Sequence, residues 1–287
     1  MQRLLAYQAL WGMENLPDVD LDDGLDRAMD RIAEAGFDGV GFALLRAERA
    51  EKAAKAATRL GQSFEITAFV RTGEELATQL RRAQDLGAHH LNVQVLERLD
   101  RVSDAVALLT DMQASVADAK IPVNFETHRG RLTNDLLFTC RVLDEMPNLR
   151  VTGDLSHYPL THEMPLPVPP VDLARISKVL DRCWGFHGRV PGSHQIQVSV
   201  EAPQHQGWVE QFKAWWREGF ANWRRRAGPD GELSFMSELG PPHYAITDAH
   251  GVELSDRWRE AIILKDIARA IWAETADAKS PQPAAAT

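Results

Sequence analysis

Strand-like and helix-like segments alternate along the whole of this chain, and the alternation limits the folds that it can adopt. Eight apolar runs typical of β-strands are separated by eight segments with helical patterns. The predicted strands cover residues 3–11, 39–45, 64–70, 89–96, 122–128, 150–157, 183–190 and 233–239. The predicted helices cover residues 22–36, 46–60, 73–87, 101–119, 133–146, 170–181, 207–227 and 255–275.

Strict strand–helix alternation requires parallel strands joined by right-handed crossovers, and eight such units can close a sheet on itself. We therefore predict an α/β fold, a single (β/α)8 TIM barrel, over residues 1–276, followed by a disordered C-terminal tail over residues 277–287. An open doubly wound sheet is the alternative, but no GxGxxG motif opens a helix after any strand. Residues 158–170 contain five prolines, which predicts an irregular loop after the sixth strand.

The composition favours a globular protein that acts on small molecules. Hydrophobic residues make up 44% of the chain, and no apolar stretch approaches the ~18 residues of a membrane-spanning helix. A formal net charge of -9 opposes attraction to nucleic acid and to anionic membranes, so we expect neither as a partner. Residues 1–7 lack the pattern of a secretory signal, which predicts a cytoplasmic protein. Cys140 and Cys183 lie far apart without CxxC spacing, which predicts buried thiols.

Polar residues fall at the ends of the last four predicted strands. In a barrel of this kind the loops after the carboxyl ends of the strands build the active site, so we expect Glu126, Asp154, His187 and Glu238 on one arc of the barrel mouth. Three carboxylates and one imidazole suit a hard-to-borderline divalent cation, which would also offset the repulsion between buried carboxylates. His89 and His90 begin the fourth strand instead, and we expect them at the opposite face of the barrel without a catalytic role.

At these strand ends the sequence resembles the xylose isomerase-like TIM barrel superfamily, which includes sugar phosphate isomerases and epimerases, inosose dehydratases and AP endonucleases. The resemblance spans nearly the whole chain and rests on the ordered set Glu, Asp-x-x-His, His, Glu. That set is matched by Glu126, Asp154-Leu155-Ser156-His157, His187 and Glu238. The resemblance implies one divalent metal ion, with manganese as first choice and cobalt, magnesium or zinc as alternatives, held by Glu126, Asp154, His187 and Glu238. It also implies that His157 contacts a substrate oxygen.

In the ketose 3-epimerase-like branch of this superfamily, the two metal-bound glutamates also act as acid and base, and the resemblance gives these roles to Glu126 and Glu238. It implies an isomerase or epimerase that acts on a sugar or sugar-like α-hydroxy ketone by proton transfer through an enediolate. Chelation of the ketone and its neighbouring hydroxyl acidifies the adjacent C–H, and a free carboxylate oxygen can then move the proton. Xylose isomerase itself uses a strand-end lysine for a hydride shift, and no lysine lies beside these strand ends.

Three other functions are weighed against this one. A metal-dependent lyase or dehydratase on a keto-sugar or keto-glycoside, similar to inosose dehydratases or 3-keto-glycoside-cleaving enzymes, shares the first deprotonation and differs in having a leaving group. AP endonuclease activity is the least favoured, because the third and fourth strands end without the extra histidines of the three-zinc enzymes and no Asp-x-His follows His187. A non-catalytic barrel is the third alternative, although the donor set is complete.

Residues beside the predicted metal ligands complete the expected site. His128 lies two residues beyond Glu126 and Arg189 lies two beyond His187, so each shares a strand face with its neighbour if the strand continues. We assign His157, Arg189 and His128 to substrate binding, although epimerase-like members place the substrate-binding arginine several residues beyond the histidine. The helix over 207–227 carries an aromatic stripe that either packs on the barrel wall or forms a homo-oligomer interface. Its members are Trp208, Phe212, Trp215, Trp216, Phe220 and Trp223.

Overall fold

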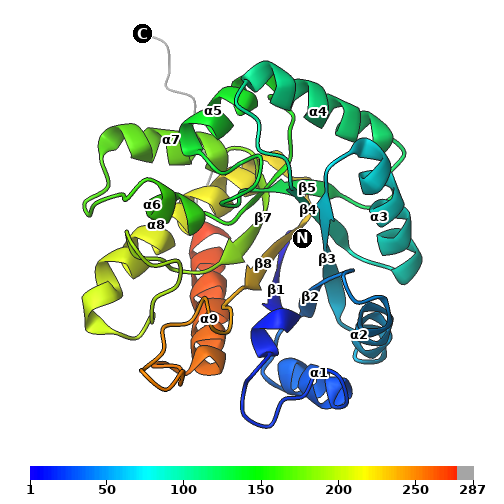
Figure 1. The fold of residues 1–287 in the computed structure, drawn as a ribbon, viewed down its shortest axis with the longest axis vertical. Helices are drawn as coiled ribbons and strands as arrows, with labels where there is room; N and C mark the ends of the chain where they lie inside the picture. Colours follow the sequence, from blue (N-terminus) through cyan, green and yellow to red (C-terminus); the bar gives the residue numbers. More distant parts are fainter. Residues whose placement is uncertain (277–287) are drawn as a thin grey trace.

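The eight predicted strands form one closed parallel barrel in the computed structural model, which describes residues 1–276 (Figure 1). The strands pair in chain order, and β8 pairs with β1 to close the sheet. They are β1 (Arg3–Ala9), β2 (Gly39–Ala43), β3 (Ser63–Val70), β4 (His90–Val95), β5 (Val123–Glu126), β6 (Val151–Gly153), β7 (Cys183–Gly188) and β8 (Glu232–Ser237). The predicted (β/α)8 barrel is therefore confirmed, and the predicted C-terminal tail lies outside the described residues.

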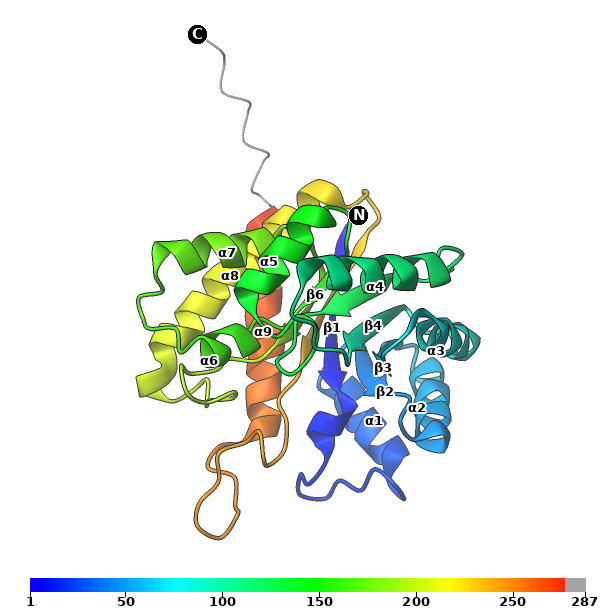
Figure 2. The same ribbon diagram turned by 45° about the horizontal axis from the view of Figure 1, so that its top comes forward.

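Helices surround the barrel and connect successive strands (Figure 2). They are α1 (Leu25–Glu34), α2 (Ala47–Arg59), α3 (Gly73–Leu86), α4 (Val102–Ser115), α5 (Leu136–Glu145), α6 (His157–Thr161), α7 (Pro170–Leu180), α8 (Gln206–Arg226) and α9 (Arg257–Ala276), with short 3-10 helices at Leu10–Met13 and Pro203–His205. No helix within residues 1–276 is both long and apolar enough to cross a membrane.

Local sequence signals explain where several helices begin and end. The Thr72 side chain accepts a hydrogen bond from the backbone N–H of Glu75 at the start of α3, and the Glu75 carboxylate accepts one from the N–H of Arg71. These two hydrogen bonds resemble a capping box, except that Glu75 bonds the residue before the N-cap, and they satisfy two N–H groups that otherwise lack partners. Gly87 then ends α3 with a left-handed φ of 84°, a conformation that glycine adopts without steric cost.

The segment after β6 differs from its prediction. Residues 158–170 were expected to be irregular, but α6 covers His157–Thr161 and includes Pro159. Pro159 lies in the first turn of α6, where backbone N–H groups have no partner within the helix, so the helix tolerates a proline there. The consequence for the site is that His157 is held by a helix rather than by a loop.

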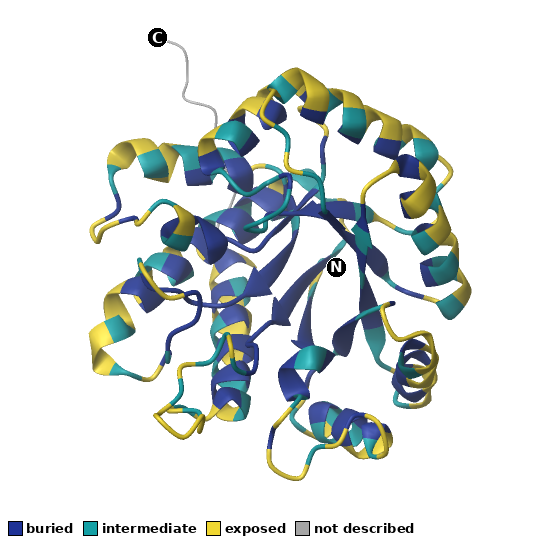
Figure 3. Cartoon of the chain, viewed as in Figure 1, coloured by how far each residue is buried: buried dark blue, intermediate teal, exposed yellow. Residues whose placement is uncertain are grey.

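Burial follows the two layers of the fold: the strands are buried almost throughout, and the helices are buried on their inner faces (Figure 3). The aromatic stripe of α8 is buried within this chain, with the Trp216 ring 5.2 Å from Phe235 of β8 and the Phe220 ring 5.2 Å from Phe186 of β7. Of the two alternatives that the sequence left open, these contacts match packing on the barrel wall. Cys140 and Cys183 are buried free thiols, as predicted.

Candidate functional site

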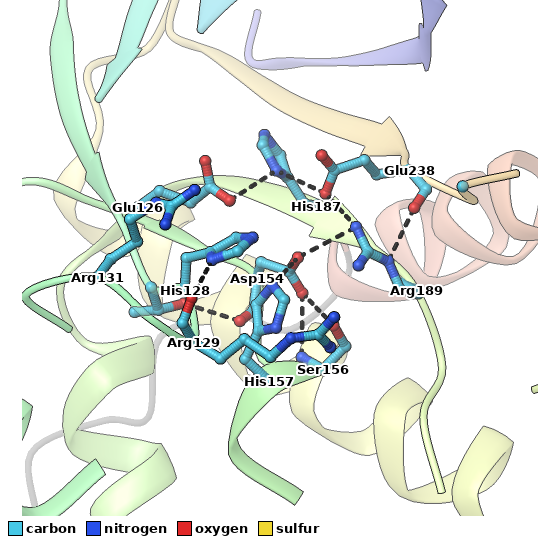
Figure 4. Close-up of polar contacts among 12 residues, drawn as sticks. Glu126, His128, Arg129, Arg131, Asp154, Ser156, His157, His187, Arg189 and Glu238 are labelled. Carbon is cyan, nitrogen blue, oxygen red and sulfur yellow. Dashed lines mark hydrogen bonds and ion pairs between the residues drawn. The ribbon is translucent and has the colours of Figure 1, made fainter. Parts of the chain in front are cut away.

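The four predicted metal ligands meet at the carboxyl ends of β5 to β8 (Figure 4). Glu126 is the last residue of β5, Asp154 follows β6, His187 lies near the end of β7, and Glu238 follows β8. Their side chains each offer one ligand atom, and these atoms all lie within 4.8 Å of one another. All four residues are buried, Glu238 the least at 7% exposure. We refer to these four residues as the acidic cluster.

Two basic side chains pair with the carboxylates of the acidic cluster: His187, which belongs to the cluster, and Arg189. The Nδ1 atom of His187 is 3.1 Å from Oε2 of Glu238 and 3.7 Å from Oε1 of Glu126. The Nη2 atom of Arg189 is 2.6 Å from the same Oε2 of Glu238 and 3.5 Å from Oδ2 of Asp154. Arg189 is itself buried, and its guanidinium lies 4.7 Å from the ring centre of Tyr244. The guanidinium therefore neutralises part of the charge of the acidic cluster.

Within the acidic cluster, the pKa values of Glu126 and His187 are both raised. Burial raises the pKa of Glu126 to about 8; the charges of Glu238 and Asp154 add to the rise, and that of His187 opposes it. Burial alone lowers the pKa of His187, but the charges of Glu238, Glu65 and Glu126 outweigh burial and hold this pKa well above its usual value. Glu126 and His187 therefore hold protons that a bound cation would displace.

The donor set fits a divalent cation. Oxygen donors predominate over one imidazole, which is the chemistry preferred by magnesium, manganese and related ions. Among the described residues, the buried Oδ2 of Asp154 accepts no hydrogen bond of good geometry, although Nη2 of Arg189 lies 3.5 Å and Nε2 of His157 lies 3.1 Å from it. A buried carboxylate oxygen with an unfilled hydrogen-bonding position, beside two further buried carboxylates, is a group that a cation would satisfy.

A second polar group shares Glu126 with the acidic cluster. Ligand atoms of Glu126, His128 and His157 also lie within 4.8 Å of one another, and the two imidazole rings are 3.9 Å apart with a tilt of 48°. Burial lowers the pKa of His157 and lowers that of His128 to about 2, so both rings are neutral. The strand stops at Glu126, but the chain beyond it still brings His128 to the side expected from the sequence.

The tautomer of His128 follows from its backbone contact. Nδ1 of His128 lies 2.5 Å from the carbonyl oxygen of Arg129, which can only accept a hydrogen bond. Nδ1 therefore carries the proton, and Nε2 keeps its lone pair. His157 is fully buried, and neither of its ring nitrogens has a hydrogen bond of good geometry, although Nε2 lies 3.1 Å from Oδ2 of Asp154. Both rings are thus able to bond a molecule placed beside them.

Polar residues inside the barrel support the acidic cluster, and sequence reasoning missed them. Asn92 and Gln94 of β4 donate hydrogen bonds to the carboxylate of Glu126. Glu65 of β3 accepts from Nε2 of His187 at 2.9 Å and lies 2.7 Å from Nε2 of His90. His90 begins β4 as predicted, but its ring lies inside the barrel and is linked through Glu65 to the acidic cluster.

The missed residues had a signal in the sequence. His90, Asn92 and Gln94 alternate with Leu91 and Val93 along a strand whose six residues are all buried. Because successive side chains of a strand point to opposite faces, polar residues at every second position mark the face that looks into the barrel. That alternation is a signal in the sequence for a polar barrel interior.

A cavity of about 320 Å³ opens beside the acidic cluster. Glu238, His128, Gln94 and Arg131 form its polar side. The opposite side comes from the ends of β1 to β3, the segments that follow these strands and the loop after β8, and it combines the charged side chains of Glu14, Arg46 and Arg49 with apolar groups. These apolar and aromatic lining residues include Leu10, Trp11, Phe42, Phe69, Met236 and Tyr244. The arrangement can hold a small molecule with one polar end at the acidic cluster and an apolar or ring-shaped part against the aromatic side chains.

Solved structures with the same fold were found along nearly the whole chain. A sugar phosphate isomerase/epimerase from Parabacteroides distasonis matches with a TM-score of 0.61 and 11% identity, covering 95% of each chain. A xylose isomerase-like TIM barrel protein from Mycobacterium smegmatis in complex with magnesium matches with a TM-score of 0.59 and 12% identity, covering 94% of this chain and 97% of that one. An AP endonuclease, family 2, from Brucella melitensis matches with a TM-score of 0.52 and 15% identity over 82% of this chain and 92% of that one.

No protein-family model and no curated protein matches the sequence. The similarity to solved structures is therefore one of fold, at 11 to 15% identity. The chain shares the (β/α)8 TIM barrel fold of these structures.

Proposed function

We propose that this protein is a divalent-metal-dependent isomerase or epimerase that acts on a sugar or sugar-like α-hydroxy ketone. The observation that carries the proposal is the meeting of three buried carboxylates and one imidazole beside a cavity at the barrel mouth. The fold adds support, since structures that share it include a sugar phosphate isomerase/epimerase and a barrel protein in complex with magnesium.

The metal ligands in this proposal are Glu126, Asp154, His187 and Glu238, with manganese as first choice among cobalt, magnesium and zinc. A bound divalent ion supplies a Lewis acid that polarises a substrate carbonyl and stabilises negative charge on its oxygen. The residues of the chain supply the remaining steps: they orient the substrate, exclude water and move the proton.

Glu126 and Glu238 are the proposed acid and base. They reach the site from opposite ends of the arc from β5 to β8, and both face Nδ1 of His187, at 3.7 Å and 3.1 Å respectively. A substrate held between them has a carboxylate on either side. One carboxylate removes the proton from the carbon next to the carbonyl, and the other returns a proton, so the reaction proceeds through an enediolate.

His157, His128 and Arg189 are the proposed substrate-binding residues. Neutral His157 and His128 each keep a ring nitrogen able to hydrogen-bond a substrate oxygen. Arg189 donates to the carboxylate of Glu238 and so fixes which oxygen of that residue stays free. The expected partner is a small molecule; neither nucleic acid nor a membrane is part of the proposal.

The apolar side of the cavity favours a second candidate, a lyase acting on a keto-glycoside. Trp11, Phe42 and Phe69 offer an aromatic surface against which an apolar substituent of the substrate can pack. The same deprotonation beside a carbonyl becomes an elimination when the next carbon carries a leaving group.

The test is incubation of the manganese-loaded protein in deuterated water with a panel of keto-sugars and keto-glycosides. An epimerase product carries deuterium at the carbon next to the carbonyl, whereas elimination yields an unsaturated product. Glu126→Gln and Glu238→Gln are expected to slow turnover by about 10²–10⁴-fold at saturating manganese. Glu274→Gln, on α9 and paired with Arg217 at the surface, is the matched control and keeps full activity. Turnover at the wild-type rate in both site variants would overturn the proposal.

A further inference from the structure

A line of polar side chains runs through the barrel interior from the acidic cluster toward the opposite face. Nε2 of His187 lies 2.9 Å from Oε1 of Glu65, and Oε2 of Glu65 lies 2.7 Å from Nε2 of His90. Nδ1 of His90 lies 2.9 Å from Nδ1 of His89, whose Nε2 is 3.1 Å from the partly exposed carboxylate of Glu232. Glu65 is the link in this line that touches a residue of the acidic cluster.

The Glu65 side chain is fully buried between two imidazoles. One carboxylate oxygen lies 2.9 Å from Nε2 of His187 and the other lies 2.7 Å from Nε2 of His90. Each oxygen is thus placed to accept a hydrogen bond from an imidazole N–H, which puts a proton on Nε2 of both rings. With its Nε2 proton engaged, His187 has only Nδ1 left to face Glu126 and Glu238.

Stability alone does not account for a carboxylate in this place. Transfer of a charged group into the barrel interior carries a desolvation penalty, and an apolar side chain of similar volume is often as good or better for folding. His90 is held in turn by the Tyr7 ring, which stacks on it at 6.3 Å with a tilt of 19°. The surroundings therefore keep Glu65 in one orientation, pointing at His187.

We propose that Glu65 is a positioning residue for metal binding: it accepts the Nε2 proton of His187 and thereby aims Nδ1 at the cation held by the acidic cluster. This inference rests on the metal site of the proposed function and adds to it a residue on β3, outside the arc that provides the ligands. Carboxylates that accept the second N–H of a ligating histidine fix the ring orientation and raise the basicity of the ligand. His90 supports the arrangement by occupying the other oxygen of Glu65.

The test compares Glu65→Met with Glu65→Gln by calorimetric titration of manganese into the chelator-treated full chain. Methionine fills the space without accepting the hydrogen bond, whereas the amide oxygen of glutamine can still accept it. Glu65→Met is expected to weaken manganese binding by about 10–100-fold, and Glu65→Gln to fall between that variant and the wild type. Glu260→Gln is the matched control, because Glu260 is also buried but bonds Ser255 away from the acidic cluster, and it should bind manganese as the wild type does.

A second readout needs no metal. Crystal structures of the cation-free variants should show the His187 ring in its wild-type orientation in Glu65→Gln and turned or split between orientations in Glu65→Met. If Glu65→Met does not fold, Glu65→Ala serves in both measurements. If Glu65→Met binds manganese with wild-type affinity and its His187 ring keeps the wild-type orientation, the inference is overturned. If the wild type itself fails to bind manganese, the proposed function fails, and the ring orientation still decides the role of Glu65.

Discussion

Arg189 and Glu238 form a buried ion pair at the barrel mouth, in which Nη2 of the guanidinium lies 2.6 Å from Oε2 of the carboxylate. Nε of Arg189 also donates to the backbone carbonyl of Glu238 at 2.8 Å. The pair joins the end of β7 to the end of β8 and positions a carboxylate that the proposed reaction needs. Arg189 and a divalent cation therefore stabilise the same negative charges.

This shared role predicts how Arg189→Ala behaves. Removal of one partner of a buried ion pair leaves carboxylates without compensation, so the cation-free variant should lose about 3–5 kcal/mol of unfolding free energy. Manganese should recover more stability in the variant than it adds to the wild type, as measured by thermal unfolding with chelator and with manganese. Arg257→Ala is the control: Arg257 is equally buried but pairs with Glu253, so its loss should not respond to manganese. An equal manganese response in all three proteins would contradict the shared role.

The pKa shifts of Glu126 and His187 predict that metal binding releases protons. Both pKa values are raised, so at neutral pH both groups hold protons that must leave before a cation binds to them. Manganese binding should therefore release about two protons per chain and tighten as the pH rises from about 6 to 8. Titration in buffers of different ionisation enthalpy measures the number released, and Glu126→Gln should lower it by about one. Affinity that is constant across this pH range would show that the two groups do not titrate with binding.

The aromatic side of the cavity predicts a substrate-dependent effect of Trp11→Ala. Trp11 lines the cavity and packs edge-on against Tyr244 with ring centres 5.3 Å apart. If an apolar substituent of the substrate packs on Trp11, removal of the Trp11 side chain should cost on the order of 1 kcal/mol of binding free energy. The KM for an aryl keto-glycoside should then rise roughly five- to tenfold. The KM for a free keto-sugar should change little. Equal increases for both substrates would indicate a general disturbance of the mouth.

Most of the fold, and the meeting of four polar side chains at the barrel mouth, could be predicted from the sequence, for identifiable reasons. Alternating segments specify a closed parallel barrel once there are eight of them, and the barrel places the strand ends together. The sequence singles out four residues because each lies near the end of a predicted strand: Glu126, Asp154, His187 and Glu238. Their joint binding of a metal is a prediction that the geometry permits and that experiment must test.

The interior partners escaped prediction because they lie within strands rather than at their ends. Glu65 and His90 lie near the amino ends of β3 and β4, where side chains usually serve stability. The pairing of β3 with β4 brings these two residues together, and a contact across the barrel interior joins Glu65 to His187. Helix α6 was missed because Pro159 argued against any helix, although a first turn accepts proline. The shape of the cavity depends on Tyr244 from the loop after β8, and no local pattern specifies that loop.

The most direct test of the central claim is the crystal structure of the protein soaked with manganese, with anomalous diffraction measured at the manganese edge. The account predicts one anomalous peak bonded by Glu126, Asp154, His187 and Glu238, with Nδ1 of His187 as the nitrogen ligand. Absence of a peak there, while the same soak saturates the protein with manganese elsewhere, would contradict it.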